Sequence, residues 1–520
     1  MERRPFKYAV ASGTKEATSI GIETASIGGN AVDVAVGVAF GLLVSNILMC
    51  SIGGGGFATV KSPDGKVEII DFFDCMPGKG LNLGYFKEHA RPQKVYLPYG
   101  VGIEVMIGHA TVGVPGTVKG LELLLERHGT LPLKEVVQPA IELARAGIHL
   151  NHNISWWLEM SAHSIHWQTE YSKKLFSMPS GEVPDSSYLF KMPDLANSLQ
   201  IIGQHGSDAV YKGDIAEAIV EEISKGGGLI TYEDIASYEA IVRKPLETTY
   251  REKYIYTNPP PSVGGVTLVE LMNIVSHIDF EKMYKPQLVT TVGKAIRLAL
   301  HDKFTRYLDP STNEEVAKEL LCPEYTFQCF KKITPGPNTT HLSSIDDEGY
   351  AVGITMSMGY GSGVGISGTG IVMDNVLGEM ELNPQGYLKT EPGQRLISGM
   401  TPTIMVNEDT NDVVVLGTPG ASRIAPCLMQ IIINLIDHKM DLYSAISSPR
   451  IHYEDNTFVM EPGIEVDENL LDKRVKIVKL DKIDMSMGGA ECVRLKEGLF
   501  PEAASDPRRS GSAQTLVIKK

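Results

Sequence analysis

The chain contains few cysteines and few tryptophans. It has six cysteines and three tryptophans in 520 residues, and no two cysteines form a CxxC pair. Zinc ribbons and thiol redox sites use closely spaced cysteine pairs, so the sequence predicts neither kind of site. We expect the cysteines to be reduced and mostly buried.

A long apolar run is also missing. The most apolar stretch, residues 34–49, is interrupted by Ser45 and Asn46 and is shorter than the span of about 20 apolar residues that a membrane helix needs. The N-terminal segment MERRPFKYAVASG has no apolar run behind its arginines, so no signal peptide is expected. We therefore predict a cytoplasmic protein with no membrane partner, and a buried helix within residues 34–49.

Acidic residues outnumber basic ones. The 48 Lys and Arg residues stand against 63 Asp and Glu residues, which gives a net charge of -15 and argues against nucleic acid as a partner. With 43% hydrophobic and 21% charged residues, the composition is typical of a globular protein with a large core. From the length we expect roughly two to four domains or one large composite domain.

Hydrophobic periodicity separates a helix-rich middle from a strand-rich C-terminal part. Residues 57–72 predict a β-hairpin, because two alternating runs flank Pro63-Asp64-Gly65. Helical patterns cover residues 17–26, 34–43, 118–128, 133–146, 215–224, 268–278 and 422–436. Strand patterns cover residues 250–256, 341–345, 351–356, 371–373, 404–406, 413–416 and 515–518. The mixture predicts an α+β fold in which helices pack on antiparallel sheets.

Two motifs that could hold a cofactor or a metal ion are weak. Residues 361–370 contain a GxGxxG pattern, but a strand-like run follows where a dinucleotide site needs a helix. Four histidines cluster near the tryptophans without a third ligand of stated geometry: His149, His152, His163 and His166. We expect aromatic packing of these histidines, no metal site and no cofactor.

A loop-like polar stretch ends at Asn338 and runs into an expected strand that begins with Thr339 and Thr340. Threonine suits both a turn and a strand, so the residue types alone favour a purely structural interpretation of this junction.

Several motifs, taken in order, change that interpretation. They lie at residues 9–12, 28–33, 53–57, 114–117, 128–131, 339–343, 361–370, 398–403, 417–420 and 506–509. In these segments the chain resembles the γ-glutamyltranspeptidase family of N-terminal-nucleophile hydrolases, over nearly its whole length. Each segment is weak alone, but together and in this order they are specific for the family. The resemblance implies a four-layer α/β/β/α sandwich.

The resemblance also implies self-cleavage of the precursor between Asn338 and Thr339. The products are residues 1–338 and 339–520, the smaller with 182 residues (520 − 338), and together they form one composite domain. The Thr339 hydroxyl is then the nucleophile. Its freed α-amine, with a reference pKa of about 7.7–8.0, is the base.

Other residues take supporting roles by the same resemblance. Ser357 stands where the family has a threonine that supports the nucleophile. The backbone N–H groups of Gly420 and Ala421 are expected to stabilise the oxyanion of the tetrahedral intermediate. The family usually has two glycines there, but alanine keeps the N–H group.

The expected substrate pocket departs from the family pattern. Phe73 stands at the place of an arginine that holds the substrate α-carboxylate, and an apolar ring cannot replace a bidentate guanidinium. The family's serine pair is reduced to Ser398 and Gly399. Glu379 stands at the position of the acid that binds the substrate amine. The catalytic residues are therefore kept, whereas the γ-glutamyl pocket is altered.

Three functions remain open at this point. The first is an autoprocessing threonine amidohydrolase or acyltransferase that cleaves γ-glutamyl amides such as glutathione and passes the acyl group to water, an amino acid or a peptide. The second is a divergent amidohydrolase, acylase or biosynthetic-pathway hydrolase with another acyl group. The third is a non-catalytic member of the family. The expected partners are a small-molecule amide and the two subunits of one precursor, and a homodimer is left open.

Overall fold

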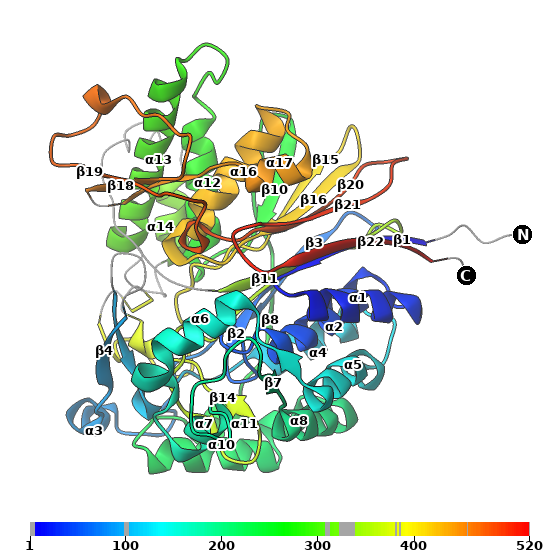
Figure 1. Cartoon of the computed structure of the whole chain (residues 1–520), viewed down its shortest axis with the longest axis vertical. Coiled ribbons are helices and arrows are strands. Elements are labelled where there is room, and N and C mark those ends of the chain that lie inside the picture. Colours follow the sequence, from blue (N-terminus) through cyan, green and yellow to red (C-terminus); the bar gives the residue numbers. More distant parts are fainter. Residues whose placement is uncertain are drawn as a thin grey trace, which may run out of the picture.

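The computed structural model describes residues 6–97, 103–306, 313–321, 339–379, 382–383, 386–454 and 456–518. In this part of the chain, two antiparallel sheets lie face to face between two layers of helices (Figure 1). In strand order, the seven-stranded sheet consists of β22 (Ser512–Ile518), β1 (Phe6–Ser12), β11 (Thr340–Asp346), β12 (Ala351–Ser357), β2 (Gly55–Lys61), β3 (Val67–Phe72) and β8 (Ile241–Arg243). The six-stranded sheet consists of β21 (Glu502–Ser505), β20 (Glu491–Leu495), β16 (Asp412–Gly417), β15 (Thr403–Asn407), β10 (Lys253–Thr257) and β9 (Leu246–Tyr250).

The two sheets contact each other through small and β-branched side chains. Ala9 and Ala11 of β1 share a buried cluster with Val413 and Val415 of β16 and Val493 of β20. Short side chains let the sheets approach closely, as in other sheet-on-sheet packings.

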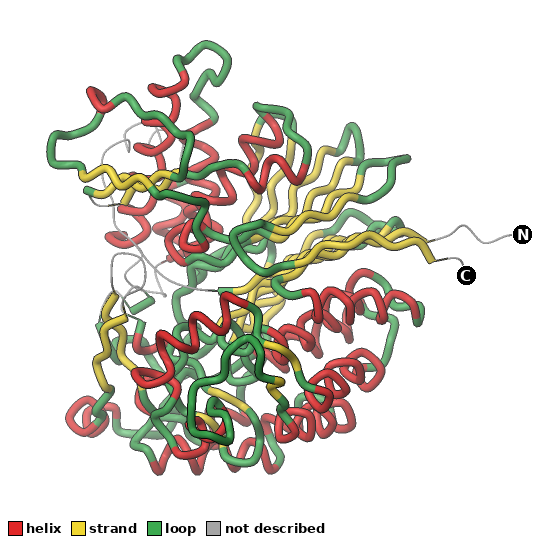
Figure 2. The backbone as a smooth tube through the Cα atoms, viewed as in Figure 1, coloured by secondary structure: helices red, strands yellow, loops and turns green. Residues whose placement is uncertain are grey.

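The helices cover the two outer faces (Figures 1 and 2). The seven-stranded sheet is covered by α1 (Lys15–Ser26), α2 (Ala31–Ser45), α4 (Thr117–His128) and α5 (Leu133–Ala146). The six-stranded sheet is covered by α12 (Val263–Val275), α13 (Lys285–Arg306), α16 (Ile424–Ile436) and α17 (Leu442–Ser447). The four-layer α/β/β/α sandwich is therefore confirmed.

Helix α2 shows how the sequence places a residue of the site. Asn30 caps its start, where the side-chain oxygen accepts hydrogen bonds from the backbone N–H groups of Val32 and Asp33. Every residue of the helix is buried, which matches its apolar sequence. The helix ends at Ser45, so Asn46 follows it directly. Among the described residues, no helix is both long and apolar enough to cross a membrane.

The structure corrects some predicted elements. The strand expected over residues 250–256 starts later, at Lys253, and is β10; a turn at Arg251, whose φ is 55°, joins it to β9, which was not predicted. The helix expected over residues 268–278 is α12, which starts earlier and ends at Val275. Helix α13 was not predicted, because its polar residues follow no clear stripe. The loop expected before Thr339 lies outside the described residues.

Both parts of the chain contribute to the seven-stranded sheet. Strands β11, β12 and β22 come from residues after 338 and pair with β1 and β2 from the N-terminal part. The division into residues 1–338 and 339–520 stays a prediction. The cysteines in the described part are free and buried, as expected: Cys50, Cys75, Cys427 and Cys492.

Candidate active site

Thr339 directly precedes β11 and is 4% exposed. Thr340 lies opposite Met356 in the antiparallel β11–β12 pair, so the register continued by one residue places Thr339 opposite Ser357. Thr339 and Ser357 also line the same cavity. The structure thus brings together the expected nucleophile and its expected supporting hydroxyl. Asn338, on the other side of the expected cleavage point, lies outside the described residues.

The cavity beside Thr339 contains about 480 Å³ of empty space. All four residues predicted to bind substrate line it, and so does Ala421, whereas Gly420 does not. The complete lining consists of Phe73, Asp74, Lys303, Thr339, Ser357, Gly359, Asp374, Val376, Glu379, Leu382, Ser398, Gly399, Met400, Ala421 and Ile424.

The two residues after Thr339 are engaged in the fold. The Thr340 hydroxyl accepts a hydrogen bond of 2.9 Å from Asn46 Nδ2. The ring nitrogens of His341 lie 2.8 Å and 3.0 Å from the hydroxyls of Thr355 and Ser343. Burial lowers the pKa of His341 to about 3, so this ring is neutral at physiological pH. Neither residue offers a free base beside Thr339.

Ser357 and Glu379 are held by the turn that follows β12. The Ser357 hydroxyl accepts a hydrogen bond of 2.9 Å from the backbone N–H of Gly359. Gly359 has a φ of 61°, and a Cβ at this position would lie 1.8 Å from Glu379 Oε1. Glycine is therefore required here by both backbone conformation and space. It allows the Glu379 carboxylate, expected to bind the substrate amine, to lie against the backbone of this turn.

The expected oxyanion donors follow β16. Gly420 and Ala421 have φ values of 131° and 67°. The left-handed conformation costs an alanine roughly 1–2 kcal/mol. Such strain concentrates at functional sites when the surrounding structure enforces it.

A neighbouring loop enforces this turn. The Thr418 hydroxyl donates to the Pro419 carbonyl at 2.7 Å and accepts from the Gly489 N–H at 2.8 Å. The segment around Gly489 therefore fixes the start of the turn that carries Gly420 and Ala421.

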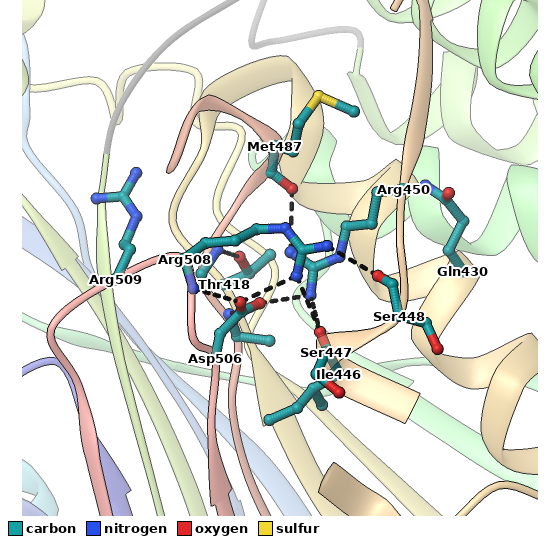
Figure 3. A network of polar contacts seen from close by, with 12 residues as sticks. Thr418, Gln430, Ile446, Ser447, Ser448, Arg450, Met487, Asp506, Arg508 and Arg509 are labelled. Atoms are coloured by element: carbon teal, nitrogen blue, oxygen red, sulfur yellow. Dashed lines mark hydrogen bonds and ion pairs between the residues drawn. The ribbon is translucent and has the colours of Figure 1, made fainter. Parts of the chain in front are cut away.

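The segment around Gly489 is itself held in place by a buried ionic network (Figure 3). Asp506 pairs with Arg450 and Arg508, and Arg450 also donates to the Met487 carbonyl at 3.1 Å. Arg508 forms a second ion pair with Glu461. Although burial alone would raise it, the pKa of Asp506 is lowered by these two arginines. Asp506 and Arg508 of this network belong to the motif at residues 506–509. The network positions the turn at Gly420 and Ala421 and does not line the cavity beside Thr339.

The cavity beside Thr339 lacks the arginine that holds the substrate α-carboxylate in the family pattern. Phe73 lies there, buried and stacked on Phe57 with a ring-centroid distance of 5.7 Å. Arg395 lies nearby, but it forms an ion pair with Asp71 at 3.2 Å and donates to the carbonyl oxygens of Asp71 and Glu239. It is not part of the cavity lining, so it does not take over the arginine's role.

Two further acids line the cavity and were not predicted as site residues. Burial, with the nearby charge of Asp374, raises the pKa of Asp74 well above its usual range, and burial raises the pKa of Asp374 to about 7. One oxygen of each, Asp74 Oδ1 and Asp374 Oδ2, has no hydrogen-bond partner among the described residues. Two such acids hold protons near neutral pH, so they place less negative charge on the cavity wall than their number suggests.

Lys303 was also missed. It lies in the last turn of α13, is 7% exposed, and lines the cavity beside Ser398 and Gly399. The Ser398 hydroxyl accepts from the backbone N–H of Met400 at 3.2 Å. No local motif marks Lys303 in the sequence, and the fold alone brings α13 to this site.

A second cavity, of about 360 Å³, lies on another side of Thr339. Asn46, Asn151, Glu491 and Arg509 contribute to its lining. Thr339 is therefore bordered by two cavities.

Two of the four clustered histidines pack against aromatic rings. His163 packs edge-on against Trp167 at 4.3 Å between ring centroids, and His166 is wholly buried near Phe176. Aromatic packing is confirmed for these two histidines. The glycine-rich residues 361–370 and the strand after them form a turn-rich hairpin of β13 (Gly365–Ile366) and β14 (Ile371–Val372) instead of opening a helix.

Comparison with known proteins points to one family. The gamma-glutamyltranspeptidase family model matches residues 17–516. The chain is 32% identical to the glutathione hydrolase proenzyme of Escherichia coli (strain K12), over 96% of this chain and 90% of that protein. It is 29% identical to the acylase ACY 1 proenzyme of Pseudomonas sp. (strain SE83), over 92% of this chain and 90% of that one.

The fold agrees with these sequence relationships. The crystal structure of cephalosporin acylase from Bacillus halodurans superposes with a TM-score of 0.84 at 25% identity, covering 99% of this chain and 96% of that chain. The expected resemblance is thereby confirmed, and with it the N-terminal-nucleophile hydrolase fold. The chain belongs to the gamma-glutamyltranspeptidase family of enzymes.

Proposed function

We propose that the protein is an autoprocessing threonine amidohydrolase that cleaves γ-glutamyl-type amides through an acyl-enzyme. The proposal rests mainly on the position of Thr339. This residue directly precedes β11, lies opposite Ser357 and lines a cavity with Ala421. A glutathione hydrolase proenzyme at 32% identity supports the same substrate class.

Maturation follows from the chemistry of threonine. The Thr339 hydroxyl attacks the carbonyl carbon of Asn338, which converts the peptide bond into an ester, and water then hydrolyses the ester. The reaction frees the α-amine of Thr339 next to its own hydroxyl. The names of both relatives include the word proenzyme, which supports a precursor of this kind.

Turnover uses the same two groups. The α-amine accepts the hydroxyl proton while Thr339 Oγ1 attacks the substrate amide, and the N–H groups of Gly420 and Ala421 stabilise the oxyanion. The amine then gives its proton to the departing amine, leaving an acyl ester. Water, or an amine in a transfer reaction, attacks this ester and releases the acyl group.

The acyl group occupies the cavity beside Thr339, where Glu379 receives the α-amine of a γ-glutamyl group. A second candidate function is an acylase for a related acyl group without that amine. Phe73 and the proton-holding pair of Asp74 and Asp374 favour it, because they make the cavity less polar than the family pattern. The names of an acylase and a cephalosporin acylase among the relatives support this alternative.

A pH–rate profile tests the mechanism. With chemistry rate-limiting, the rate should rise between about pH 7 and 8, because the α-amine must be neutral to accept a proton. A flat profile over that range would rule out the α-amine as the base. Comparing γ-glutamyl and glutaryl anilides separates the two substrate classes, and adding glycylglycine separates hydrolysis from transfer. A cytoplasmic location and a homodimer stay predictions.

A further inference from the structure

On the wall of the cavity, the charged end of Lys303 lies where a side chain on residue 399 would extend. A Cβ atom on Gly399 would lie 2.9 Å from the Lys303 Nζ and 3.9 Å from its Cε. A contact under 3.0 Å is closer than real Cβ atoms allow, so a larger residue at 399 would displace the ammonium group. Gly399 therefore leaves room for the charged end of Lys303.

Backbone conformation does not explain this glycine. The φ of Gly399 lies outside the left-handed region that favours glycine, so other residues could adopt the same backbone. What a Cβ atom at residue 399 would meet first is the ammonium group at the flexible end of Lys303. The family pattern has a serine here, and the absence of that side chain coincides with the presence of a cation.

Lys303 is the basic side chain within the described lining of the cavity. Arg395 and Arg423 also lie in this region, but neither belongs to the lining: Arg395 pairs with Asp71, and Arg423 lies 3.8 Å from Glu454. Lys303 is only 7% exposed. A buried ammonium next to the reaction site attracts an anionic ligand, because water screens the charge less there than at the surface.

We propose that Lys303 binds a carboxylate at the far end of the substrate's acyl chain, and that Gly399 is the residue that admits it. The proposal rests on the proposed function and names its substrate class, the monoamide of a dicarboxylic acid. γ-Glutamyl and glutaryl groups share this carboxylate. They differ in the α-amine, which Glu379 faces across the same cavity.

Four p-nitroanilides form two matched pairs for the test. The γ-glutamyl and 4-aminobutyryl compounds differ by the carboxylate, and so do the glutaryl and butyryl compounds. Lys303→Met removes the charge at similar volume. We expect kcat/KM for the two carboxylate substrates to fall about 10- to 150-fold, the range for a lost charge-assisted hydrogen bond, with little change for the other two.

Two variants serve as controls. Lys303→Arg keeps a cation and should retain part of the preference for carboxylate substrates. Lys285→Met removes an exposed lysine at the other end of α13 and should leave all four rates unchanged. Correct folding is checked by thermal unfolding and by cleavage into two chains.

Gly399→Ala tests the shared space directly. Its new Cβ should displace Lys303 and lower the carboxylate preference in the native background. In Lys303→Met, the same substitution should add little, since no ammonium remains to be displaced. A double-mutant cycle with non-additive effects is therefore expected, and additive effects would contradict the proposed coupling.

The proposal is overturned if Lys303→Met lowers all four rates equally or leaves the carboxylate preference intact. If the mature protein cleaves none of the four anilides, the proposed function fails instead. Calorimetric titration of mature protein with glutarate and with butyrate then tests Lys303 without turnover. Binding of glutarate that is lost in Lys303→Met supports the proposal, and equal binding before and after the substitution overturns it.

Discussion

The hydroxyl of Thr340 accepts a hydrogen bond of 2.9 Å from Asn46 Nδ2, at the end of the buried helix α2. This contact gives Thr340, the second threonine of the junction, a structural role. Thr339, one residue earlier, lines both cavities and is the residue whose amine cleavage would free. Two adjacent residues of the same type thus have different roles.

Substitution of the two threonines should give different results. Thr339→Ala should abolish both maturation and turnover, because it removes the nucleophile. Thr340→Ala should retain part of each while costing about 1–3 kcal/mol of stability, because the buried Asn46 amide loses its acceptor. Denaturing gels and turnover rates measure both effects.

Thr339→Ser is the matched control, since it keeps the hydroxyl and the α-amine, and some maturation should remain. Equal losses in Thr339→Ala and Thr340→Ala, in folded protein, would contradict this division of roles.

Replacing Ala421 tests the strained turn. Ala421→Gly should relieve roughly 1–2 kcal/mol of left-handed strain, offset by about 0.4–1 kcal/mol from the greater freedom of glycine when unfolded. The net gain in free energy of unfolding is between zero and about 1.6 kcal/mol, with activity retained because the N–H remains. Urea unfolding and kcat measure this. A clear loss of stability would show that the turn is not strained.

Much of the fold could be predicted from the sequence, because periodicity reports burial on one face. The helix over residues 133–146 matches α5, and the hairpin over residues 57–72 matches β2 and β3. The β9–β10 hairpin was missed because its turn uses Arg251 in a left-handed conformation, without a glycine or proline to mark it.

The site was predicted only as far as local motifs reach. Resemblance identified Thr339, Ser357 and Glu379, which all line one cavity. Lys303 could not be found this way, since nothing in its own helix indicates a pocket. Only the packing of α13 against the six-stranded sheet brings it to Gly399.

The ionic network behind the oxyanion turn should be essential for stability. Asp506→Asn leaves Arg450 and Arg508 buried without their shared charge partner, which should cost about 3–5 kcal/mol. Asp472→Asn, in the exposed pair with Arg474, should change stability far less, because water screens this pair. Denaturant unfolding compares the two variants. Similar small losses in both would mean that the network does not hold this part of the fold.

The acid pair predicts a pH dependence of stability. Asp74 has a raised pKa in the folded protein, so above pH 4 the folded state binds more protons than the unfolded state, and stability falls as pH rises. Asp74→Asn should weaken this fall in stability with rising pH above about pH 4, because asparagine has no proton to release. Asp64→Asn, at an exposed turn, should leave the slope unchanged. If stability, measured by urea unfolding, changed equally with pH in Asp74→Asn and in the native protein, the raised pKa of buried Asp74 would be contradicted.

The central claim is that Thr339 becomes the N-terminal nucleophile of a processed enzyme. Intact-mass measurement with N-terminal sequencing of purified protein tests it most directly, before and after incubation with a γ-glutamyl or glutaryl amide. We predict two chains, of residues 1–338 and 339–520, the second starting at Thr339 and gaining the mass of the acyl group. A single uncleaved chain of 56.6 kDa after prolonged incubation, or a second chain that starts at Thr340, would contradict the account.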